Sequence, residues 1–93
     1  MNTTNPATSS PRIPQAMVDA IDTAAKLIAI EEAAAAVAEE AANLFRHEAS
    51  GDDAEYEITH RIFHACVRHL ADISGLNRKT ITEQALLTAF HNS

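Results

Sequence analysis

The sequence has few of the residues on which enzymes and many ligand-binding proteins depend. Aromatic residues make up 4% of its 93 positions and tryptophan is absent, so the usual stacking platforms for sugars and nucleobases are missing. It holds no glycine-rich phosphate loop. Acidic neighbours such as Glu31 and Glu32 point about 100° apart on a helix, so they do not form a catalytic pair. We therefore expect a non-enzymatic protein without a cofactor or a small-molecule substrate.

Cysteine and long apolar runs are equally scarce. Cys66 is the single cysteine, which excludes an internal disulfide and a cysteine-based zinc finger. A lone thiol in an apolar helical run is typical of a small core residue. The chain has no run of apolar residues long enough to span a membrane, and residues 1–10 lack the basic start and apolar run of a secretory signal. We expect a cytoplasmic protein that does not interact with membranes.

Glycine and proline punctuate the chain at only a few places. The three prolines lie in the first 14 residues, and the two glycines are Gly51 and Gly75. We expect a disordered tail over residues 1–10 and one all-helical domain over residues 11–93, because the first ten residues are polar and have nothing to bury. The domain is predicted to contain a long Ala-rich helix over about 14–49 and two shorter helices over about 53–73 and 78–91.

The long helix carries an apolar seam with the spacing of a coiled coil. Its members follow alternating steps of four and three residues: Met17, Ile21, Ala24, Ile28, Glu31, Ala35, Ala38, Ala42 and Phe45. The helix is roughly 50 Å long, whereas a 93-residue globule is about 26 Å across. We predict that the seam is a protein interface formed by Met17, Ile21, Ile28, Ala35, Ala38, Ala42 and Phe45, and that the chain forms homodimers. Glu31 either reaches out at the seam edge or fixes its register.

The two shorter helices are predicted to bury one stripe each. In the second helix the stripe contains Thr59, Ile62, Phe63, Cys66, Leu70 and Ile73. In the third it contains Ile81, Ala85, Leu86, Ala89 and Phe90. Together these helices are just long enough to cover the long helix if they lie antiparallel and aligned to it. If they pack together as a corner, much of the seam remains available for a partner.

Residues 70–86, LADISGLNRKTITEQAL, resemble a helix-turn-helix DNA-binding element. Ala71 lies four residues before Gly75 and Ile81 six residues after it, which suits two helices that cross closely at a glycine turn. The resemblance implies that Asn77, Arg78, Lys79 and Thr82 contact the major groove or its phosphates. The segment is also similar to the paired helices of ribbon-helix-helix repressors. An ordinary corner of a small helical bundle would have the same pattern.

Charge and histidine placement bear on the choice of partner. Residues 1–59 hold three basic and eleven acidic residues, a balance of −8, whereas residues 60–93 have a balance of +2. The acidic part repels DNA phosphates and favours a basic protein surface.

His60 and His64 are four residues apart, with Glu57 one turn earlier, but zinc needs at least three protein ligands and Arg61 and Arg68 oppose a cation. We expect no metal site there; the pair could instead make an interface sensitive to pH.

Three functions follow from these patterns. The first is a small regulatory protein that acts by helix-mediated protein binding, for instance by sequestering or inhibiting a transcription regulator. The second is a DNA-binding transcriptional regulator, in which the long helix dimerises and the shorter helices read adjacent major grooves. The third is an acidic helix that mimics nucleic acid, although alanine rather than carboxylates forms most of its surface. A net charge of −6 disfavours the second.

Overall fold

The computed structural model describes residues 12–93, which fold into three α-helices with no strand among them. Helix α1 spans Gln15–Ser50, α2 spans Asp53–Ser74 and α3 spans Arg78–Asn92. The all-α architecture predicted from the sequence is confirmed, and α1 runs without a break through Glu31. The predicted tail over residues 1–10 lies outside the described residues.

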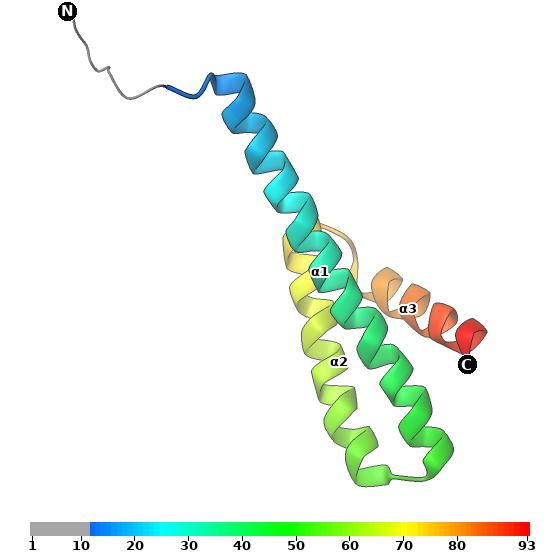
Figure 1. Cartoon of the computed structure of the whole chain (residues 1–93). Helices are drawn as coiled ribbons and strands as arrows, with labels where there is room; N and C mark the ends of the chain where they lie inside the picture. The colour runs from blue at the N-terminus through cyan, green and yellow to red at the C-terminus, as the bar shows by residue number, and fades with distance from the viewer. Residues whose placement is uncertain (1–11) are drawn as a thin grey trace, which may run out of the picture.

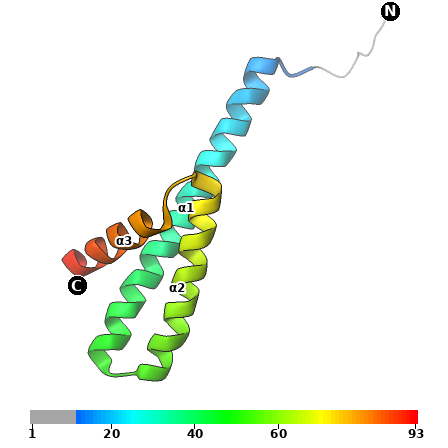
Figure 2. The same ribbon diagram turned by 180° about the vertical axis from the view of Figure 1, so that it is seen from behind.

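Helices α1 and α2 form an antiparallel hairpin, and α3 crosses it obliquely (Figures 1 and 2). Because α2 has 22 residues and α1 has 36, α2 lies only against the second half of α1, and the first half extends beyond the hairpin (Figure 1). The molecule is accordingly elongated, with principal extents of 73 × 22 × 20 Å.

The connection between α1 and α2 is fixed by backbone and side-chain caps. Gly51 adopts a φ of 75° and donates its N–H to Glu48, while the Asp52 N–H reaches the carbonyl of His47. These two hydrogen bonds form the Schellman arrangement that closes many helices. Asp52 then accepts the N–H of Glu55 at 3.1 Å and so begins α2. The reversal places α2 beside the helix that precedes it.

The corner between α2 and α3 is equally local in origin. Gly75 has a φ of 75° and donates its N–H to Ala71 at 2.9 Å. The Ser74 hydroxyl donates to Leu70 at 2.6 Å and accepts the N–H of Leu76 at 3.2 Å. The serine therefore contacts backbone groups on both sides of the turn at the end of α2.

The core lies inside the hairpin and beneath α3. Its buried members on α1 are Ala33, Val37, Ala41 and Leu44; those on α2 are Thr59, Phe63, Val67 and Leu70; those on α3 are Ile81 and Ala89. Ala41 is fully buried, so the two hairpin helices approach closely there. The core thus occupies only the second half of α1.

On α1, the hairpin uses a stripe about a third of a turn away from the predicted seam, and Ala35 and Ala38 of the seam are exposed. Two parts of the predicted packing are wrong. On α2, Val67 replaces Ile62 and Ile73, which are exposed, in the buried stripe. On α3, Phe90 is 62% exposed, because the neighbouring Ala89 is the residue buried at this end of the helix and successive side chains on a helix point about 100° apart.

Candidate protein-binding surface

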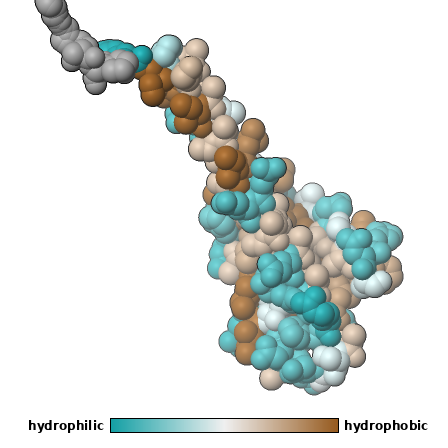
Figure 3. All heavy atoms as spheres, in the orientation of Figure 1, coloured by the Kyte–Doolittle hydropathy of each residue, from teal (hydrophilic) through white to brown (hydrophobic). Residues whose placement is uncertain are grey.

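The projecting part of α1, residues 15–29, is here called the arm. None of its residues is buried, and all but Val18 are exposed. Its large apolar side chains stay about half exposed: Met17 54%, Ile21 53%, Leu27 57% and Ile28 54%. Figure 3 shows hydrophobic side chains gathered along this part of the rod. Isolated apolar side chains are common on protein surfaces, but a row of this length on a projecting helix is typical of an interaction site.

In the second half of α1, one side of the helix packs on α2. On the arm, that same side is polar. Asp19 and Lys26 precede the buried Ala33 by fourteen and seven residues, so they lie on the same side of the helix. On this side the arm therefore has no large apolar residues with which a longer α2 could pack. Its apolar side continues the predicted seam instead, and Met17, Ile21 and Ile28 all lie on it. Within the described residues, no other helix covers that side.

The second half of the seam opens into a groove between α1 and α3. The groove has a volume of about 770 Å³, and its α1 side is lined by Ala34, Val37, Ala38, Ala42, Phe45 and Ala49. On the opposite side, Ile81 and Ala85 of α3 line it, together with Leu76 from the turn before α3. Because alanine dominates the α1 side, the groove has a shallow apolar floor. Three predicted interface residues, Ala38, Ala42 and Phe45, thus line one surface.

Arg46 is the charged residue that lines this groove. Its guanidinium hydrogen-bonds to the Asn43 side-chain oxygen, and the Asn43 amide in turn donates to Glu40 at 3.3 Å. This chain of contacts runs along the surface of α1. It leaves the floor of the groove apolar.

The sequence reasoning missed some members of both surfaces. Leu27 is more than half exposed but lies beside the seam rather than on it. The α3 side of the groove was not foreseen, because it depends on the angle at which α3 crosses α1. Ile58 is also exposed, and together with Ile62 it forms a second apolar pair on α2. The available signal for that pair was the four-residue spacing of Ile58 and Ile62, although Ile62 was predicted to be buried.

The residues predicted to contact DNA lie around the corner between α2 and α3. Asn77, Arg78 and Lys79 are exposed, whereas Thr82 is half-buried. The Asn77 side-chain oxygen accepts the N–H groups of Lys79 at 2.8 Å and Thr80 at 3.3 Å. That oxygen therefore acts as the N-cap of α3. Arg78 and Lys79 are exposed on the first turn of α3.

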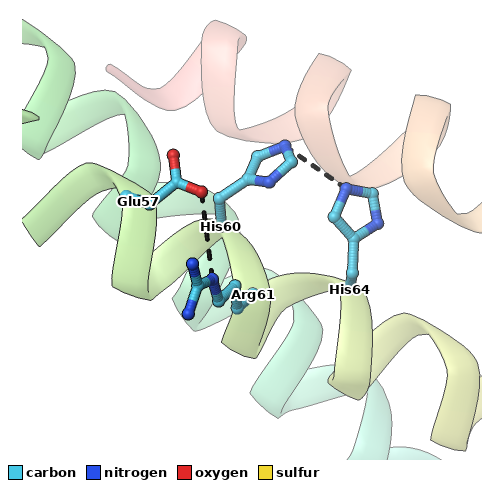
Figure 4. Close-up of polar contacts among 4 residues, drawn as sticks. All are labelled: Glu57, His60, Arg61 and His64. Atoms are coloured by element: carbon cyan, nitrogen blue, oxygen red, sulfur yellow. Dashed lines mark hydrogen bonds and ion pairs between the residues drawn. The ribbon is translucent and has the colours of Figure 1, made fainter.

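His60 and His64 contact each other on the outer side of α2 (Figure 4). Their Nε2 atoms are 3.3 Å apart and their ring centroids 4.4 Å apart. The Glu57 carboxylate pairs with Arg61 at 3.8 Å, as Figure 4 shows. Among the described residues, no three histidine, cysteine or acidic side chains are grouped closely enough to hold a metal.

Cys66 lies half-buried beside the core. Burial raises the pKa of its thiol, and the nearby Glu40 carboxylate raises it further. Both effects disfavour the thiolate, which is the reactive form. The thiol is therefore poorly suited to act as a nucleophile.

Comparison of the chain with protein-family models, with curated proteins and with solved structures finds no match. Within residues 12–93, none of the helices is both long and apolar enough to cross a membrane. The arm and the groove are both apolar surfaces that the described residues present to solvent.

Proposed function

We propose that this chain is a small, non-enzymatic regulatory protein that works by helix-mediated binding to another protein. The observation that carries the proposal is the exposure of Met17, Ile21 and Ile28 on an arm that no other helix in the described part of the chain covers. Helices with one unpartnered apolar side commonly bind in the groove of a partner or pair with a second helix. The partner is a different protein or a second copy of this chain.

For a different protein as partner, the expected role is sequestration or inhibition, with a transcription regulator as one such target. The acidic balance of residues 1–59 supports a partner with a basic surface. Opposite charges speed the encounter, and apolar burial along the arm then supplies affinity. We further propose a cytoplasmic location.

Site-specific photo-crosslinking in the native host tests this function. A photoreactive phenylalanine analogue at Leu27 reports on the arm, and the same analogue at Arg61, on the solvent side of α2, serves as the matched control. We expect a protein adduct from position 27 in excess of that from position 61. Equal yields from the two positions would contradict binding through the arm.

DNA binding is the second candidate, and the corner between α2 and α3 favours it. Gly75 has a positive φ, Ile81 is buried, and Arg78 and Lys79 are exposed on the first turn of α3. Titration with random duplex DNA at two salt concentrations tests it. A phosphate-binding protein shows affinity that falls steeply with salt, and Arg78→Ala with Lys79→Ala should abolish it. No binding at low salt would leave protein binding as the only candidate.

A further inference from the structure

The arm and the groove are two halves of one seam on α1. The arm contributes the large residues Met17, Ile21 and Ile28, whereas the groove floor is built from the small residues Ala38, Ala42 and Ala49. One half therefore projects side chains, and the other half has space for them. Two α1 helices that run antiparallel therefore bring the large residues of each one to the small residues of the other.

We propose that a second copy of this chain occupies the groove, with the two α1 helices antiparallel and the twofold axis at the level of Ala33. This inference rests on the proposed function and names the partner. The seam alternates between the two core positions of a coiled coil, a and d. In an antiparallel pair, each layer joins an a position of one helix to a d position of the other. Applied to this seam, the layers pair Met17 with Ala49, Ile21 with Phe45, Ala24 with Ala42, Ile28 with Ala38, and Glu31 with Ala35.

Two of these five layers place a large residue against a small one. Ile28 of one copy lies over Ala38 of the other, and Met17 lies over Ala49. Alternation of large and small residues across a helix interface favours interdigitated packing. A parallel pair would instead place Ile28 against Ile28 and Ala38 against Ala38, so that no layer joins a large residue to a small one. The groove favours the antiparallel arrangement.

The size of the contact also favours a reciprocal pair. Helix α1 is about 54 Å long and about 10 Å wide, so two paired copies cover roughly 1,100 Å² before corrugation is counted. Stable interfaces bury about 1,200–2,000 Å². A single arm in a single groove would bury about half as much, which is in the range of incidental contacts. Two arms in two grooves therefore come close to the lower end of that range, whereas one arm in one groove does not.

The proposed axis brings acidic side chains together. Glu31 and Glu32 of both copies lie near it, because these residues are close to Ala33 in the sequence. Like charges at close range oppose association, and salt screens them. The dimer should therefore become tighter as salt increases. Binding of the acidic chain to a basic partner would respond in the opposite direction.

Sedimentation of the purified full chain tests the proposal. We expect a dimer whose dissociation constant falls with added salt, and at least a tenfold loss of affinity for Ile28→Glu. Ile58→Glu is the matched control, because Ile58 is 51% exposed on α2 and lies outside the seam. Glu31→Gln with Glu32→Gln should tighten the dimer several-fold. Loss of the dimer in Ile58→Glu but not in Ile28→Glu would overturn the proposed surface.

Disulfide trapping tests the orientation in a Cys66→Ser background. One population carries Ala24→Cys and the other Ala42→Cys, and both positions lie on the surface of α1 or the floor of the groove. After mixing and oxidation, the antiparallel arrangement yields crosslinks between the two variants. Crosslinks within each population alone would indicate a parallel pair and contradict the proposal.

The outcome also separates this inference from the proposed function. A purified chain that stays monomeric at about 100 μM, which is about 100 times a Kd of 1 μM, would overturn the dimer. If position 27 then still forms adducts with a different protein in the host, binding through the arm stands. If neither association is found, both proposals fail.

Discussion

The rings of Phe45 on α1 and Phe90 on α3 lie with their centroids 6.3 Å apart and their planes inclined by 49°. This is the tilted geometry that aromatic pairs favour, and it joins the last turn of α3 to α1. Phe90 nevertheless remains 62% exposed. The contact therefore positions the end of α3 beside the groove without adding a residue to the buried core.

Phe90→Ala should cost far less stability than Phe63→Ala. Phe63 is 1% exposed, and truncation of a buried phenylalanine costs about 3–5 kcal/mol. Loss of one exposed aromatic contact costs about 0.5–1.5 kcal/mol. Urea unfolding of the two variants measures the difference. Equal costs would show that the end of α3 packs more closely than this structure indicates.

Ala41→Leu should destabilise the hairpin. Ala41 has no exposed surface, so the added carbons force α1 and α2 apart, at a cost of about 1–3 kcal/mol. Ala65→Leu is the matched control, because Ala65 is exposed on α2 and leucine is a good helix former. Thermal unfolding followed by circular dichroism should show a lower Tm for the first variant alone. An unchanged Tm for Ala41→Leu would exclude close packing at this point.

Gly51→Ala and Gly75→Ala should each destabilise the fold by about 1–2 kcal/mol, the cost of placing an L-residue in the left-handed region. Both glycines have a φ of 75°, and a Cβ at either position meets no atom within 4 Å. The cost is therefore conformational and not steric. Asparagine tolerates this region better, so Gly75→Asn should be milder than Gly75→Ala in urea unfolding. If the two variants were equally destabilised, backbone conformation would not be the cause.

The sequence predicts the helices well because their boundaries depend on local chemistry. Gly51 and Gly75 end α1 and α2, and Asp52 and Asn77 cap the helices that follow. These devices act over a few residues, and all four can be identified without knowledge of the tertiary structure. The helix bounds therefore fall within one residue of the predicted ranges.

The side on which each helix packs was harder to predict. Helix α1 has two apolar stripes, one through Val37 and Leu44 and one through Ile28 and Ala38, and the regular four-three spacing favoured the second. The hairpin uses the first stripe. Because α2 covers only the second half of α1, the stripe that packs on α2 needs to extend only over that half. The position of Phe90 depends on the crossing angle of α3, which side-chain packing determines and local sequence does not. An unpartnered apolar stripe therefore indicates a binding surface only after the other stripe has been assigned to the hairpin.

Cys66 should react slowly with iodoacetamide in the folded chain. Its pKa is raised by burial and by the Glu40 carboxylate, so less thiolate is present at a given pH, and the thiolate is the form that reacts. Because the folded state holds this proton more tightly than the unfolded state, the thiol contributes stability at neutral pH. That contribution is lost as the pH rises past the thiol's unfolded pKa toward its raised folded value.

The measurement is the alkylation rate between pH 7 and pH 10, with and without urea. We expect the folded chain to react more slowly and its rate profile to lie at higher pH. Glu40→Gln removes the carboxylate but keeps the size of the side chain, so it should move the profile part of the way back. A Glu40→Gln profile identical to that of the unchanged chain would assign the whole shift to burial. A folded profile that coincides with the urea profile would contradict both causes, because neither desolvation nor the carboxylate would then act on the thiol.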